Sequence, residues 1–266
     1  MQIHFTLYYL YTDDLLLQIF SMINKNEIGF NVNTIVIDDE YKFNKGKELL
    51  NIHLKEFLFK SGIIIKSEDG RNSLILCITN KKNPVLSISI KYESLSIFML
   101  NEKRFLSNNL LNSDSLIFGS ANEYDFSLSE DTFDIQTYEL LYGKVSPSKI
   151  KKDEDGYEYI DKNECYGHTV YIEGIGFKAS WRMYFGKFFY EKLELQEKLM
   201  NYKNCNQNLL SNNIIFIELF SSPQDHIVRK NYTLLNDFRI YISLDTVLNK
   251  ISTAISSASK GVRPHS

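Results

Sequence analysis

The sequence has few of the features that disulfide-rich or membrane-spanning folds require. Its 266 residues include three cysteines, four prolines and one tryptophan. Because Cys77, Cys165 and Cys205 are odd in number and far apart, we expect a reducing compartment and no disulfide scaffold. No apolar run approaches the roughly 20 residues of a membrane helix, and the first residues lack the features of a signal peptide. We therefore expect a soluble, cytoplasmic protein with no membrane partner.

A strong charge of one sign is also lacking. The net charge is −3 and the pI is about 6.0, which argues against a nucleic-acid partner, because binding phosphate requires a basic field. Hydrophobic residues make up 44% of the chain and aromatic residues 14%, enough for a real core and too much for a disordered chain. The length allows one large domain or two small ones.

Local reaction motifs are absent. The sequence has no G-x-S-x-G, H-E-x-x-H, G-x-x-x-x-G-K-[ST] or G-x-G-x-x-G pattern. Cys165-x-x-His168 has no second ligand pair, and zinc needs four ligands or three and a water. We predict no catalytic residues, no metal and no cofactor. One alternative stays open: an enzyme, such as a hydrolase, whose site is assembled from scattered residues, for example Asp38, Asp39 and His168.

Short strands and helices alternate along the chain. Thr12 is a suitable N-cap for a helix, and Asp69-Gly70 suits the turn of a hairpin. Branched and aromatic runs predict strands, whereas apolar residues at helical spacing predict helices. The expected strands are 3–11, 34–37, 63–66, 74–79, 85–92, 96–100, 169–175, 212–220 (in a central position) and 238–244, and the expected helices are 13–23, 45–60, 103–111, 188–201 and 246–256.

These elements predict a single α+β domain with a mixed or mainly antiparallel sheet and packed helices. We place the domain at residues 1–256, with an acidic and charged insertion at about 122–168 and a flexible tail at 257–266. Residues 171–193 hold the only tryptophan among many aromatic residues, a composition typical of a core. We predict that Trp181 and Tyr184 serve packing, on one helical face if the segment is helical.

One segment has a charge of a single sign. Between residues 105 and 143 there are seven acidic residues and no Lys or Arg. Two interpretations are open: a solvated surface, or a face that recognises a basic partner. In the second, acids steer association and aromatic residues anchor the contact. The candidate partner-binding residues are Glu123, Tyr124, Asp125, Phe126, Glu130, Asp131, Phe133, Asp134 and Tyr138.

The order of elements around Ser180-Trp181-Arg182-Met183-Tyr184-Phe185-Gly186 resembles a known family. The chain is similar to immunity proteins of bacterial polymorphic toxin systems, whose members carry a small residue, Trp, two residues and Tyr late in the chain. Ser180 stands where that family usually has Gly, and this chain carries extra residues between Phe126 and Thr169. The resemblance implies a cytosolic, non-catalytic α+β protein that binds a cognate toxin domain and neutralises it. The acidic segment suits a toxin domain with a basic surface.

Overall fold

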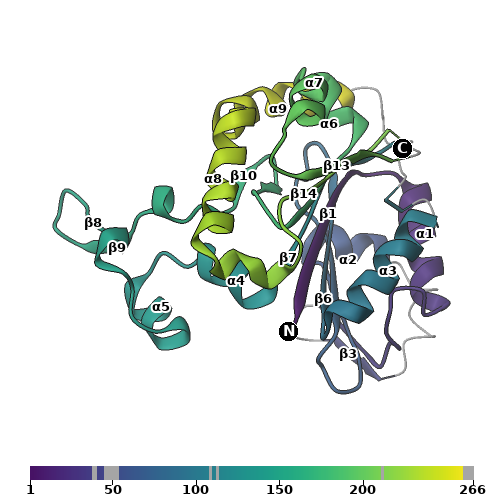
Figure 1. Ribbon diagram of the computed structural model, residues 1–266. Coiled ribbons are helices and arrows are strands. Elements are labelled where there is room, and N and C mark those ends of the chain that lie inside the picture. The colour runs from purple at the N-terminus through teal and green to yellow at the C-terminus, as the bar shows by residue number, and fades with distance from the viewer. Residues whose placement is uncertain (38–40, 45–53, 108–109, 112–113, 211–212, 260–266) are drawn as a thin grey trace.

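The computed structural model describes residues 1–37, 41–44, 54–107, 110–111, 114–210 and 213–259. Within these residues one ten-stranded sheet runs through the molecule, and every pairing in it is antiparallel (Figure 1). The strands, in order across the sheet, are β13 (Asn206–Leu209), β14 (Ile215–Glu218), β12 (Arg182–Phe185), β7 (Leu116–Glu123), β1 (Ile3–Leu10), β6 (Val85–Tyr92), β5 (Ser73–Ile78), β4 (Ile63–Lys66), β2 (Thr34–Ile37) and β3 (Tyr41–Asn44). The predicted α+β class is confirmed.

Three helices lie on one face of the sheet, over the half that contains β6, β5 and β4 (Figure 1). They are α1 (Asp13–Asn24), α2 (Leu54–Lys60) and α3 (Leu95–Ser107). Helix α1 begins as predicted, since Thr12 accepts a hydrogen bond from the N–H of Leu15 at 3.2 Å. Phe5 of the central strand β1 packs against Phe98 and Phe105 of α3. The opposite face of this half is partly open, because Ile75 of β5 is 39% exposed.

The other half of the sheet is covered on its opposite face. The covering elements are α4 (Tyr124–Glu130), α6 (Lys187–Lys192), α7 (Gln196–Asn201), η4 (Pro223–Ile227), α8 (Arg229–Ile242), α9 (Leu244–Ser259) and the small sheet of β10 (Val170–Ile172) and β11 (Ile175–Phe177). Phe118 of β7 packs against Phe177 and Phe185, and Phe185 packs against Phe238 of α8. Because both faces are covered here, β7 is buried along almost its whole length.

Residues 131–166 stand away from this body, and we call them the arm (Figure 1). The arm contains α5 (Ile135–Tyr142), η2 (Pro147–Lys149), β8 (Ile150–Lys152), β9 (Glu158–Ile160) and η3 (Lys162–Glu164). Its own small core consists of Val145, Ile160 and Cys165, which are lined by Phe133, Ile135, Tyr138 and Ile150. The arm lies inside the predicted insertion of 122–168, whereas residues 122–130 belong to the body.

Several element predictions are wrong. Residues 238–244, predicted as a strand, lie in α8 and the start of α9, because Leu235, Phe238 and Ile242 form a buried helical stripe. Residues 96–100, also predicted as a strand, lie within α3, and residues 188–201 form two short helices rather than one. Strand β14 lies one strand from the sheet edge rather than in its centre. Residues 45–53 and 260–266 lie outside the described residues.

Candidate partner-binding site

Trp181 and Tyr184 lie in the core, each 1% exposed. They are not on one helical face, because Tyr184 belongs to strand β12 and Trp181 directly precedes it. The indole Nε1 of Trp181 donates to the carbonyl oxygen of Phe220 at 2.8 Å, and its ring packs against Phe98. The hydroxyl of Tyr184 donates to Glu102. Both side chains thus join the β12 region to α3, and Trp181 also joins it to the segment after β14.

The acidic segment divides into inward and outward residues, contrary to the expectation of one recognition face. Glu130 is 4% exposed and Phe126 is 7% exposed, so neither is available to steer or anchor a partner. The reason is that α4 packs on the body and buries Phe126, Ser127 and Glu130, which share one side of the helix. Asp131 is also engaged inside the chain, since it accepts hydrogen bonds from the N–H and hydroxyl of Thr169 at 2.6 and 2.7 Å.

The other predicted contact residues are spread over three settings. Glu123 and Asp134 are N-caps, which accept hydrogen bonds from the N–H groups of Phe126 and Thr137. The hydrogen bond from Thr137 lowers the pKa of Asp134. Phe133 and Tyr138 line the small core of the arm, and Tyr124 lies edge-on to His4 under the ammonium group of Lys91. Of the nine candidates, Asp125 and Asp134 are the ones that are exposed.

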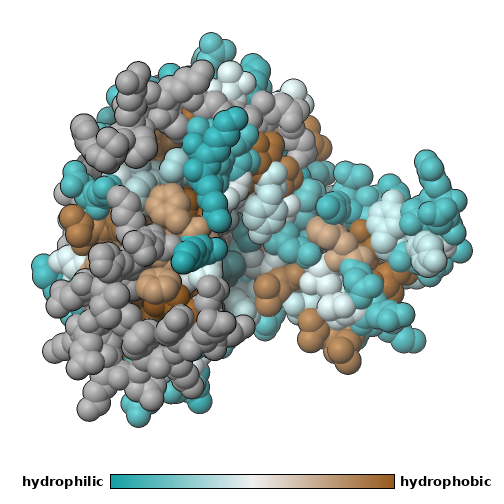
Figure 2. All heavy atoms as spheres, turned by 180° about the vertical axis from the view of Figure 1, so that it is seen from behind, coloured by the Kyte–Doolittle hydropathy of each residue, from teal (hydrophilic) through white to brown (hydrophobic). Residues whose placement is uncertain are grey.

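The structure brings out an apolar surface that the sequence reasoning missed. Leu140 and Leu141 of α5 are 84% and 60% exposed, and Leu128 of α4 is 40% exposed. Figure 2 shows apolar side chains gathered on the arm. Residues Ile135 and Tyr138 already supply the inner face of α5, so the two leucines have no core to fill. The sequence of α5 did contain a signal for this surface, because it has more apolar residues than one helical face can bury.

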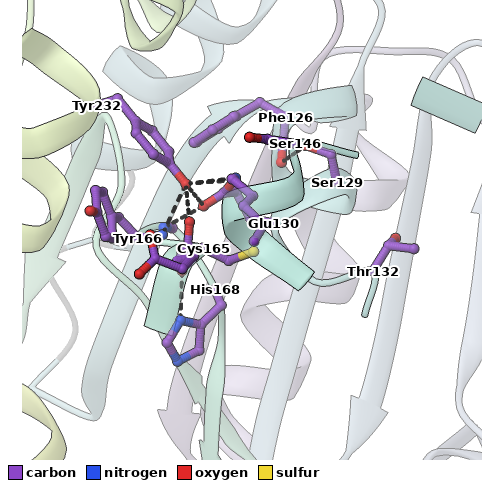
Figure 3. A network of polar contacts seen from close by, with 12 residues as sticks. Phe126, Ser129, Glu130, Thr132, Ser146, Cys165, Tyr166, His168 and Tyr232 are labelled. Carbon is purple, nitrogen blue, oxygen red and sulfur yellow. Dashed lines mark hydrogen bonds and ion pairs between the residues drawn. The ribbon is translucent and has the colours of Figure 1, made fainter. Parts of the chain in front are cut away.

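The arm meets the body at a network around the hydroxyl of Tyr232 in α8 (Figure 3). This hydroxyl lies 3.0 and 3.1 Å from the two carboxylate oxygens of Glu130 and 3.0 Å from the carbonyl oxygen of Glu164. It accepts from Lys149 Nζ and from the N–H of Tyr166, both at 3.2 Å. We call these residues, with Gly167, the junction. Every other residue of the junction comes from the arm or from its two ends.

The carboxylate of Glu130 is the buried acid of the junction. It accepts a hydrogen bond from the N–H of Gly167 at 2.7 Å, and Lys149 Nζ lies 3.9 Å away. Burial raises the pKa of Glu130, while Lys149 and the Gly167 N–H oppose that rise. Burial likewise raises the pKa of the Tyr232 phenol, so this hydroxyl keeps its proton at neutral pH.

Cys165 and His168 also lie where the end of the arm meets α8. Cys165 is 1% exposed and burial raises the pKa of its thiol to about 12, so it is not a thiolate. His168 Nδ1 lies 2.6 Å from the carbonyl oxygen of Cys165, and Arg239 of α8 donates to His168 Nε2 and to its carbonyl oxygen, both at 2.9 Å. These contacts suit a neutral ring protonated on Nδ1. Among the described residues no three His, Cys, Asp or Glu side chains gather as metal ligands.

A second polar cluster lies under α4. Lys178 donates to the hydroxyl of Ser127, and His4 Nε2 lies 2.7 Å from the hydroxyl of Ser89. Burial lowers the pKa of Lys178 and lowers that of His4 to about 3. A serine beside a lysine of lowered pKa is a known type of nucleophile. Here, however, Ser127 is 2% and Lys178 7% exposed, so no substrate reaches them in this conformation.

The residues of the enzyme alternative do not form a site in the described part of the chain. Asp38 and Asp39 lie outside the described residues, and His168 belongs to the contact with Arg239. A surface hollow of about 520 Å³ lies elsewhere, among the loops around Asn31–Asn33 and Ser67–Asn72. Its lining is three asparagines, two acidic residues, one serine and one valine.

No helix in the described part of the chain has the length and apolar character to cross a membrane. Comparison of the sequence and structure with protein-family models, curated proteins and solved structures finds no match. The resemblance to immunity proteins therefore stays a prediction.

Proposed function

We propose that this protein is a non-catalytic inhibitor that binds one toxin domain through its arm, as an immunity protein does. The observation that carries the proposal is the pair Leu140 and Leu141, which are 84% and 60% exposed on a helix held away from the body. A single exposed leucine is ordinary on a protein surface. Two adjacent ones on a projecting helix supply the apolar centre that protein contacts use.

The charge around these leucines indicates the kind of partner. Asp134 caps the start of α5, Glu139 directly precedes the two leucines, and Asp125 is exposed on α4, the preceding helix. No Lys or Arg occurs between residues 105 and 143. A partner with an apolar pocket rimmed by basic residues is complementary to this surface. A toxin domain that acts on nucleic acid carries such a basic surface, because it must bind phosphate.

The alternative of an enzyme receives no comparable support from the described residues. Glu102 and Glu218 both bind Arg182. Ser127 and Lys178 are buried. The enzyme hypothesis therefore rests only on the scattered residues that suggested it in the sequence.

The test uses the purified toxin domain that the proposal expects to be encoded directly upstream of this gene. We expect the wild-type protein to bind this domain and block its activity, and the Leu140→Asp/Leu141→Asp double variant to bind at least about 30-fold more weakly, the loss of one hot spot. Leu17→Asp is the matched control, because Leu17 of α1 is 66% exposed on the body. Failure of the wild-type protein to bind or inhibit the toxin domain would overturn the proposal.

A further inference from the structure

One phenol joins the arm to the body. The hydroxyl of Tyr232, on α8, contacts Glu130 in α4 directly before the arm, Lys149 in the middle of the arm, and Glu164 and Tyr166 at its end. Glu130 and Tyr232 are 102 positions apart in the sequence. Residues from three separate places along the arm segment thus meet at one atom.

The hydrogen bonds at this atom are mutually dependent. The hydroxyl has a single proton, which it donates to the carboxylate of Glu130 or to the carbonyl of Glu164, and its oxygen accepts from Lys149 and Tyr166. Lys149 Nζ lies 5.2 Å from the centre of the Tyr232 ring and 3.9 Å from Glu130. Loss of the hydroxyl would therefore remove the shared partner of all four groups at once.

The aromatic contacts of Tyr232 are separate from its hydroxyl. Its ring stacks on Tyr166 with centroids 4.7 Å apart and meets the edge of Phe126 at 6.3 Å. A phenylalanine at this position keeps both ring contacts. The substitution Tyr232→Phe is thus expected to leave the arm attached and folded while it removes the polar contacts of the hydroxyl with Lys149, Glu164 and Tyr166.

We propose that Tyr232 is a positioning residue, which fixes the angle of the arm to the body so that α5 meets its partner in one orientation. The inference rests on the proposed function, because it concerns binding through α5. An arm that samples several angles is competent to bind for only a fraction of the time. The apparent dissociation constant then rises by the inverse of that fraction, which is tenfold if the fraction is about one tenth.

The experiment measures the arm in the free protein first. Spin labels are placed on Tyr157→Cys in the exposed turn before β9 and on Ile240→Cys in α8, which are 73% and 67% exposed. The background carries Cys77→Ser and Cys205→Ser, and the buried Cys165 is kept. Double electron–electron resonance then gives the distribution of distances between arm and body.

Tyr190→Phe is the matched control. It also removes a partly buried phenol hydrogen bond, from Tyr190 to the carbonyl oxygen of Asn213 at 2.6 Å, but within the body. We expect Tyr232→Phe to broaden the distance distribution and to weaken binding of the toxin domain about tenfold, with Tyr190→Phe changing neither. The same narrow distribution in Tyr232→Phe and wild type would overturn the inference, whatever the toxin does. A broadened distribution with unchanged affinity would also overturn it. Absence of toxin binding by the wild-type protein would instead contradict the proposed function.

Discussion

Two buried glutamates, one in the body and one at the junction, have very different partners. Glu102 of α3 lies 2.5 Å from the guanidinium group of Arg182 and accepts from the hydroxyl of Tyr184. Glu130 has its nearest cation, Lys149, at 3.9 Å, and its hydrogen bonds come from neutral donors, the Gly167 N–H and the Tyr232 hydroxyl. The body therefore uses a close ion pair where the junction uses a weaker, more adjustable set of contacts.

The difference between the two sets of contacts suits what each one holds together. The guanidinium of Arg182 bridges Glu102 and Glu218 and lies over the ring of Trp181 at 4.4 Å, so it joins α3, β12 and β14 in one cluster. Such a cluster is costly to disturb, since each remaining charge would be buried and unpaired. The junction joins the arm to α4 and α8, and we expect loss of the Tyr232 hydroxyl to alter where the arm points more than whether the body folds.

Removing the ring at the centre of the body cluster should have the largest effect. We expect Trp181→Ala to destabilise the protein by about 3–5 kcal/mol, because it leaves a cavity and removes the hydrogen bond to Phe220. Urea denaturation measures the loss. An unchanged stability together with lost toxin binding would show that Trp181 is a contact residue and not part of the core.

Removing the cation of the same cluster should cost nearly as much. Arg182→Ala leaves the buried Glu102 and the partly buried Glu218 without their cation, for which we expect a loss of about 3–5 kcal/mol. Adding Glu102→Gln to this variant should restore part of the stability, since one uncompensated charge is removed. A loss below about 1 kcal/mol in the single variant, the size of a surface ion pair, would contradict the contrast between body and junction.

Glu130 at the junction should make the stability of the protein depend on pH. Because burial raises its folded-state pKa above the ordinary value of 4.5, its contribution to stability is fully present below that value and is lost as the pH rises through the raised pKa. Glu130→Gln cannot titrate. We expect the stability of the wild type, relative to this variant, to fall as the pH rises above 4.5 and through the raised pKa of Glu130. Parallel pH profiles of the two proteins would contradict this.

The exposed acids should have the smallest effect. We expect the variant Asp125→Asn/Asp134→Asn/Glu139→Gln to slow association with the toxin domain by a few fold at low salt and to leave the dissociation rate unchanged. The asparagine at position 134 keeps the cap of α5. The effect should fade as salt screens the charges. Stopped-flow kinetics at several salt concentrations measure it, and an unchanged association rate at low salt would remove the electrostatic part of the account.

The sequence predicted the fold better than the site, for physical reasons. Alternating branched residues in β1, β5 and β6 and the cap at Thr12 are local signals, so these elements were found. Residues 238–244 were mistaken for a strand because their apolar pattern is short. Only Leu235, which lies further back, extends it to the helical stripe with Phe238 and Ile242.

For the site, the charge imbalance located the segment but not the side chains that face outward. Helix α4 has seven residues, too few for a periodic pattern to show that Phe126 and Glu130 face inward. The partner of Glu130 in α8 is distant in sequence, so no local pattern links them. The exposure of Leu140 and Leu141 depends on the arm leaving the body, which is a tertiary feature.

The central claim is that α5 is the surface that the partner covers. Hydrogen–deuterium exchange of the protein, alone and with its toxin domain, tests it most directly. We predict that binding slows amide exchange in α5, Ile135–Tyr142, and leaves the loops around Ser67–Asn72 unchanged. Slowed exchange at those loops with no change in α5 would contradict the claim and place the contact on another part of the molecule.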